Sequence, residues 1–117
     1  MKLLLERGEV DPDLTDDGGR TPLSYAAGYG YSGAVKPLLK QEEVNPDLAD
    51  GAGRTPLSYA SESGSDEVVK LLLEREEVNP GVADNDGQTP FYFASRSGST
   101  RVATLLQSSK AVSPTTI

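Results

Sequence analysis

Residues 53–60 read GRTPLSYA, the same letters stand at 19–26, and the related GQTPFYFA stands at 87–94. The threonines of the three copies, Thr21, Thr55 and Thr89, are 34 residues apart. A unit of this length has too little apolar surface to fold alone, so each copy must pack on its neighbours. The period therefore predicts a solenoid of stacked repeats that forms one continuous array.

Similarity outside this motif sets the expected repeat boundaries. The stretch EVNPDLAD at 43–50 returns as EVNPGVAD at 77–84. The aligned copies divide the chain into a partial repeat followed by three repeats, the last with a truncated loop: 1–15, 16–49, 50–83 and 84–117.

The middle copy predicts a short first helix. Thr55 is a good N-cap, and the proline that follows it suits the first helical position because its φ is already helical. Leu57, Ala60 and Ser61 then fall on one face of the helix at i, i+3 and i+4. Gly64 is placed to end the helix with a positive φ.

A second helix and a loop complete the unit. Ser65 is predicted to cap this helix, whose first turn carries two acids and whose later residues 68–73 are rich in Val and Leu. The loop that follows is rich in turn formers and includes the hairpin signal Asp86-Gly87. Each repeat therefore reads as helix, turn, helix and an extended loop with a hairpin tip.

Pro37 stands in the first repeat where the second has Leu71. If Ser32 caps the second helix of the first repeat, this proline removes one backbone hydrogen bond just past the first turn. The interior penalty approaches ~3 kcal/mol. We therefore predict that the first repeat has the loosest second helix.

The motif GRTPLSYA, Gly64 and the run VVKLLLE at 68–74 resemble the ankyrin repeat family over essentially the whole chain. The period is one residue longer than is usual in that family, and Ser24, Ser58 or Tyr92 replaces its frequent histidine. The resemblance implies an all-α solenoid of helix-turn-helix units with hairpin-like loops. It also implies that the first helices and the hairpin tips form a concave side that contacts a protein partner.

Positions on that implied concave side that vary between the copies are the expected contact residues. Arginine and tyrosine are typical interface anchors, so Tyr29 and Arg54 are the strongest candidates. Variation within one chain is equally expected from drift on a solvated face. The predicted partner-binding residues are Asp17, Arg20, Tyr29, Arg54, Glu62, Asn85, Asp86, Gln88 and Arg96.

Tyr25, Tyr59 and Phe93 occupy one repeat position and form an aromatic series. Such a series is compatible with a stacking platform for bases or sugars. The resemblance favours packing between helices instead, because the family has leucine there. We therefore expect these rings in the core, with the tyrosine hydroxyls reaching a partner at its edge.

Composition narrows the functional classes. The 117 residues include 18 acids and 11 bases, for a net charge of −7, so most of the surface should repel phosphate backbones. The chain contains no Cys and no His, which removes the thiolate and imidazole ligands of a zinc site. Clustered acids such as Asp16 and Asp17 are explained by turn formation without calcium. No cofactor, metal or nucleic acid is expected.

Membrane insertion and catalysis are also disfavoured. No apolar run approaches the ~20 residues of a membrane span, so an intracellular location is expected. A serine nucleophile would lack a histidine base, and no cysteine nucleophile exists. The glycine-rich residues 28–33 follow a helix and lack a downstream Gly-Lys-Ser/Thr.

The sequence thus predicts a scaffold that binds a basic or neutral protein through its concave face and hairpin tips. The alternative is a structural spacer within a larger regulatory protein, with no partner of its own. End-to-end self-association is a further expectation, through apolar residues near the two ends of the array: Leu3, Leu4, Leu5, Leu105 and Leu106.

Overall fold

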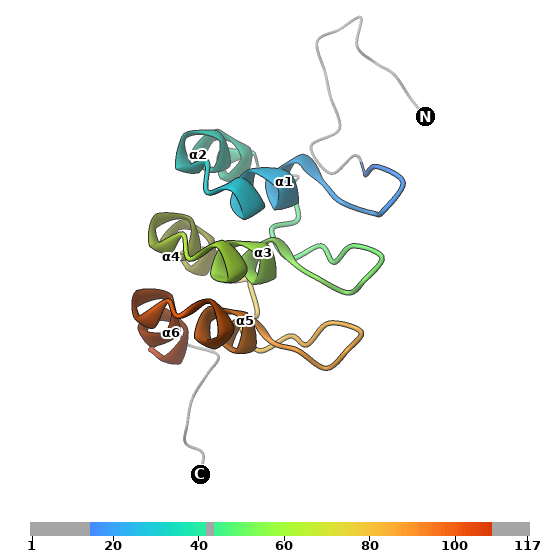
Figure 1. Cartoon of the computed structure of the whole chain (residues 1–117). Coiled ribbons are helices and arrows are strands. Elements are labelled where there is room, and N and C mark those ends of the chain that lie inside the picture. Colours follow the sequence, from blue (N-terminus) through green and yellow to red (C-terminus); the bar gives the residue numbers. More distant parts are fainter. Residues whose placement is uncertain (1–14, 42–43, 109–117) are drawn as a thin grey trace, which may run out of the picture.

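The computed structural model describes residues 15–41 and 44–108, and within them the chain forms six α-helices in three consecutive pairs (Figure 1). No strand occurs in these segments. The predicted all-α stack is confirmed. The helices are α1 (Pro22–Tyr29), α2 (Ser32–Lys40), α3 (Pro56–Ser63), α4 (Asp66–Leu73), α5 (Pro90–Ser97) and α6 (Thr100–Gln107).

The pairs are layered so that equivalent helices lie next to each other. α1 packs on α3 and α3 on α5, while α2 packs on α4 and α4 on α6. The two helices of each pair also pack on one another. The loops between pairs project from one side of the stack, and the second helices lie on the side away from the loop tips (Figure 1). Each layer therefore depends on its neighbours for burial.

The first helices begin and end where the sequence predicts. Thr55 has extended backbone angles, and its Oγ1 accepts a hydrogen bond of 3.2 Å from the backbone N of Ser58. Pro56 follows as the first helical residue. Gly64 closes α3 with a φ of 73° and donates its backbone N–H to the carbonyls of the last turn. α1 and α5 repeat this Thr-Pro start and glycine end.

The predicted cap of α4 has the expected N-cap residue but no side-chain bond, and the predicted cap of α2 by Ser32 is wrong. Ser65 holds the N-cap position of α4, but its side chain makes no capping hydrogen bond, and its Oγ lies 3.0 Å from the Oγ of Ser63. Ser32 is the first residue of α2, and Tyr31 precedes it as the N-cap. In α4, the hydroxyl of Ser63 thus competes with the backbone of the first turn for the hydroxyl of Ser65. In α6 the hydroxyl of Ser99 does cap, accepting from the backbone N of Val102.

The core lies between the layers. The predicted inward face of α3 is fully buried: Leu57, Ala60 and Ser61 have no exposed surface. α4 contributes the buried residues Val68, Val69 and Leu72.

The expectation of an exposed apolar end at Leu105 and Leu106 is wrong for Leu106, which is fully buried. Leu105 packs against the core and remains partly exposed. Leu3, Leu4 and Leu5 lie outside the described residues, as does the partial repeat at 1–15 except for its last residue.

Amide exchange in α2 is expected to be faster than in α4. Pro37 lies inside α2 and has no N–H to donate to the carbonyl of Gly33 four residues earlier. α2 also buries only Val35 completely, whereas α4 buries three side chains. Hydrogen exchange of the native chain measures the difference residue by residue. Equal or slower exchange in α2 would show that the proline does not loosen this helix.

Candidate interaction surface

The loop tips are ordered by one aspartate in each repeat. Asp50 Oδ1 accepts hydrogen bonds of 2.9 Å from the backbone N atoms of Ala52 and Arg54, and the backbone N of Asp50 donates to the carbonyl of Arg54. Asp16 and Asp84 make the same bonds in their loops. Aspartate therefore has a turn-forming role at these positions, as predicted.

Adjacent tips are also joined to each other. The backbone N of Gly51 donates to the carbonyl of Gly18 at 2.8 Å, and the backbone N of Asn85 donates to the carbonyl of Ala52 at 2.9 Å. The side-chain amide of Asn85 adds a bond of 3.0 Å to the carbonyl of Gly51. The three tips thus form one connected edge. We call the surface made by α1, α3, α5 and the tips at 16–20, 50–54 and 84–88 the hairpin face.

The burial predicted for the aromatic series is complete only at Phe93, whereas both tyrosine hydroxyls reach a partner as predicted. Tyr25 is 39% exposed, Tyr59 is half-buried, and only Phe93 is buried. For Tyr25 the reason is helical geometry: Leu23 is fully buried, and a residue two positions later points about 200° away from it. The hydroxyl of Tyr25 donates to Asp16, and that of Tyr59 donates to Asp50. These bonds fasten each helix to its own loop.

Arg54 is held between two repeats. Its guanidinium carbon lies 4.1 Å from the ring centre of Tyr59 in its own repeat and 4.1 Å from that of Phe93 in the next. Its Nε donates to Ser58 Oγ at 3.0 Å, and its Nη2 pairs with Glu62 at 2.8 Å. The side chain is only 16% exposed. Arg54 therefore joins α3 to α5 through contacts on both faces of its guanidinium.

The equivalent positions in the other repeats are occupied differently. Arg20 is exposed and lies 5.5 Å from the ring centre of Tyr25. Gln88 is half-buried and carries no charge. Among these three equivalent positions, Arg54 alone has its guanidinium close to two rings. This contact lies at the junction between the second and third repeats.

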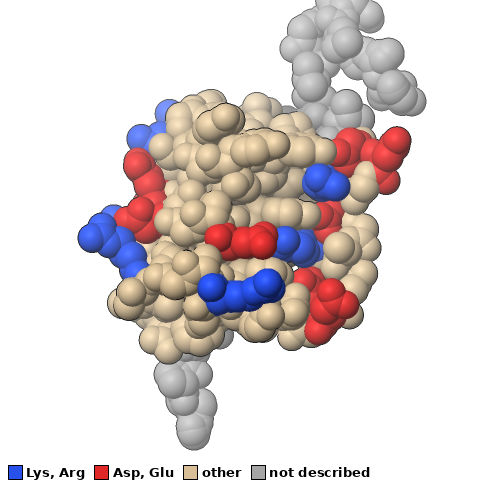
Figure 2. Space-filling view, viewed as in Figure 1, with Lys and Arg blue, Asp and Glu red and all other residues tan. Residues whose placement is uncertain are grey.

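Exposed aromatic and charged side chains also occur on the first and third repeats. Tyr29 is 66% exposed and stacks on Tyr31 with ring centres 5.5 Å apart. Arg96 is exposed and lies 5.9 Å from the ring centre of Tyr92. Glu62, Phe93, Arg96 and Ser97 line a shallow pocket of about 120 Å³. Figure 2 shows acidic and basic side chains mixed on this side of the molecule, with acidic ones gathered along the edge where the tips lie.

The environment of the tyrosine hydroxyls shifts their pKa values. Burial, and then the hydrogen bond to Asp50, raises the pKa of Tyr59 to about 12. The hydrogen bond to Asp16 raises the pKa of Tyr25, and the same bond lowers the pKa of Asp16. Both tyrosines therefore favour the neutral phenol.

Stability is expected to fall between about pH 10 and pH 12. The Tyr59 hydroxyl ionises near pH 10.0 in an ordinary environment but near 12 in the folded chain, so the unfolded chain loses its proton first. The contribution is complete below pH 10 and is lost as the pH rises through the folded pKa. Thermal unfolding between pH 9 and 12 tests this. Tyr59→Phe, which has no ionising hydroxyl, should give a shallower decline, and identical declines would contradict the assignment.

The structure places the nine predicted residues in three settings. Arg54 and Glu62 form an ion pair, and Glu62 and Arg96 line the shallow pocket. Asp17, Asn85 and Asp86 lie exposed at the tips, with Arg20 and Gln88 at the ends of the same turns. Tyr29 lies at the end of α1, beside Tyr31. Whether these residues bind a partner stays a prediction.

Sequence reasoning predicted partners for the tyrosine hydroxyls but did not identify them as Asp16 and Asp50. Asp, Arg and Tyr recur together at positions 16, 20 and 25 and again at 50, 54 and 59. In the third repeat the set changes to Asp84, Gln88 and Phe93. The arginine and the tyrosine hydroxyl are thus lost together. This joint change was the available signal that the three positions act as a unit.

Comparison with known families agrees with this architecture. A family model described as ankyrin repeats, in three copies, matches residues 1–81 and 29–116. The chain belongs to the ankyrin repeat family. A search of the curated proteins finds no match. In the described parts of this ankyrin repeat chain, no helix has the length and apolar character needed to cross a bilayer. Ankyrin repeats are in general modules for protein–protein interaction, and the repeat boundaries at 15/16, 49/50 and 83/84 stay a prediction.

Proposed function

We propose that this ankyrin repeat array is a non-catalytic scaffold that binds a protein partner through the hairpin face. The observation that carries the proposal is the exposure of aromatic and arginine side chains on a frame held by its own hydrogen bonds. Tyr29, Tyr92 and Arg96 are exposed, while Asp50 and its equivalents fix the loop tips of the same face. A preordered surface loses little conformational freedom when it binds.

The shallow surface of the hairpin face suits a protein partner better than a small-molecule ligand. The pocket of about 120 Å³ beside Arg96 is smaller than the ~300–1,000 Å³ of typical ligand sites. Exposed tyrosine and arginine are the residue types that dominate protein interfaces. A broad contact centred on α3 and α5 is therefore the favoured mode of binding.

The charge of the surface favours a basic or neutral partner. Asp17 and Asp86 are exposed at the tips, and the chain as a whole carries a net charge of −7. A phosphate backbone would meet this edge with like charge. The proposed setting is intracellular.

A structural spacer is the second candidate, and one observation favours it. Arg54 and Asn85, two of the predicted contact residues, make contacts between repeats. Side chains that hold the stack together contribute less to recognition. In this alternative the hairpin face has no partner, and the array only separates other parts of a larger protein.

Affinity capture from cell extract distinguishes the two candidates. Tyr29→Ala/Arg96→Ala should lose a captured partner, because both side chains are exposed and neither holds repeats together in the described structure. Arg54 is left unchanged because its loss would loosen the junction between repeats. The control Glu67→Ala/Lys70→Ala alters two exposed residues of α4 and should retain the partner. An unchanged set of captured proteins in both variants would support the spacer.

A further inference from the structure

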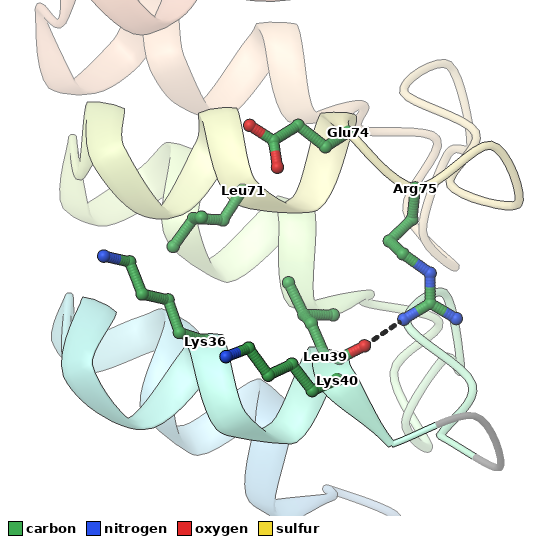
Figure 3. Close-up of a pocket in the computed structure, with 6 residues that line it drawn as sticks. All are labelled: Lys36, Leu39, Lys40, Leu71, Glu74 and Arg75. Carbon is green, nitrogen blue, oxygen red and sulfur yellow. Dashed lines mark hydrogen bonds between the residues drawn. The ribbon is translucent and has the colours of Figure 1, made fainter.

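A groove lies between α2 and α4, on the second helices and away from the loop tips (Figure 3). Its volume is about 320 Å³. Leu39 and Leu71, both partly buried, come from adjacent repeats and form its apolar part. The complete lining is Lys36, Leu39, Lys40, Leu71, Glu74 and Arg75.

Arg75 fixes one end of this groove. Its Nη1 donates to the carbonyl of Leu39 at 2.7 Å, which ties the end of α4 to the last turn of α2 (Figure 3). Its Nη2 pairs with Glu77 at 2.7 Å. The separation of the two helices is therefore held by a charge-assisted hydrogen bond, and the groove is preformed.

Two lysines of α2 give the groove its positive side. Lys36 and Lys40 are one helical turn apart, both are exposed, and neither has a carboxylate within ion-pair distance among the described residues. In Figure 3 the Lys36 side chain extends from α2 toward Leu71, and the Lys40 side chain lies along α2 below it. The corresponding residues of α4 are Lys70 and Glu74, so the unpaired lysine pair is not repeated there. An acidic chain thus carries a local basic groove with an apolar floor.

We propose that this groove binds a short acidic peptide segment of another protein. An apolar side chain of the peptide lies on Leu39 and Leu71, and flanking carboxylates pair with Lys36 and Lys40. Charge complementarity selects the acidic segment, and the apolar floor selects the side chain between the charges. Glu74 on the opposite rim disfavours a uniformly acidic ligand that covers both sides of the groove.

A membrane surface is a poorer occupant. An anionic bilayer needs a broad basic face, but α4 begins with Asp66 and Glu67, and Glu76 and Glu77 follow its end. These acids lower the net positive charge that this part of the molecule offers to such a surface, and Asp66 and Glu77 also pair with Arg101 and Arg75. A narrow peptide can reach the two lysines without meeting these acids.

Fluorescence anisotropy with labelled peptides tests the proposal on the whole chain. The probe is an acidic peptide with one central leucine, and the comparison probe has serine in place of leucine. Lys36→Glu and Lys40→Glu should each weaken binding of the leucine probe by about tenfold or more, because each turns an attraction into a repulsion. Arg101→Glu makes the same charge change on an exposed residue of α6, which does not line the groove, and should leave affinity within about twofold.

Each other outcome overturns the proposal. Equal weakening by Arg101→Glu and Lys40→Glu would show only a response to net charge. Equal binding of the serine probe would remove the role of the apolar floor. Lysine-dependent binding of phosphatidylserine vesicles in preference to the peptide would assign the groove to a membrane surface.

NMR shift changes of the native chain with the leucine probe should map to α2 and α4. Tyr29→Ala/Arg96→Ala should bind the probe normally, which separates this test from that of the hairpin face.

Discussion

Leu57→Ala is expected to lower the free energy of unfolding by about 2–5 kcal/mol. Leu57 is fully buried in α3, which packs against both α1 and α5. The cavity therefore affects contacts with both neighbouring repeats. Because domains of this size have about 5–15 kcal/mol of stability in total, the change removes a large fraction of it.

Urea unfolding followed by circular dichroism measures this loss. Leu71→Ala is the matched control, because it removes the same atoms from a side chain that is only partly buried. The control should cost clearly less than Leu57→Ala, since a half-exposed side chain leaves a smaller cavity and less lost burial. Equal costs at the two positions would contradict the assignment of the core to the interior of the stack.

Gly53→Ala is expected to destabilise the chain by about 2–4 kcal/mol. Gly53 has a φ of 79°, which is unfavourable for alanine. A Cβ atom at Gly53 would also lie 2.8 Å from the backbone N of Asn85 and 2.6 Å from its Oδ1. Because that backbone N donates to Ala52, the tips of the second and third repeats would have to separate.

Gly87→Ala provides a matched control for this substitution. Gly87 has the same φ of 79° in the next repeat, but no described atom lies within 4 Å of a Cβ placed there. It should therefore show only the backbone cost of about 1–2 kcal/mol. The difference between the two variants in urea unfolding isolates the contact between tips. A Gly87→Ala variant as unstable as Gly53→Ala would show that this contact contributes nothing.

Much of the fold is predictable because local chemistry sets the ends of the first helices. Thr55 and its proline begin α3, and Gly64 ends it, since each residue type has a conformational preference independent of the rest of the chain. The cap of α4 was not predictable in the same way. The hydroxyl of Ser65 has an alternative partner in Ser63, and only the folded geometry decides between them.

The candidate site was predicted less well because its residues meet across repeats. Arg54 is of a residue type that commonly anchors interfaces. In the structure, however, the ring of Phe93, 39 positions later, covers one face of its guanidinium. Sequence spacing alone does not show which side of a helix meets the next layer. The same limitation placed Tyr25 in the core, although it points away from Leu23 toward the loop.

Site-specific photo-crosslinking tests the proposed role of the hairpin face most directly. A benzophenone amino acid replaces Tyr29 or Tyr92 on that face, or Glu67 on α4 as the control, and all three positions are exposed. The account predicts a discrete adduct with one protein from positions 29 and 92 and none from 67. Adducts of equal yield from all three positions, or none from 29 and 92, would contradict it.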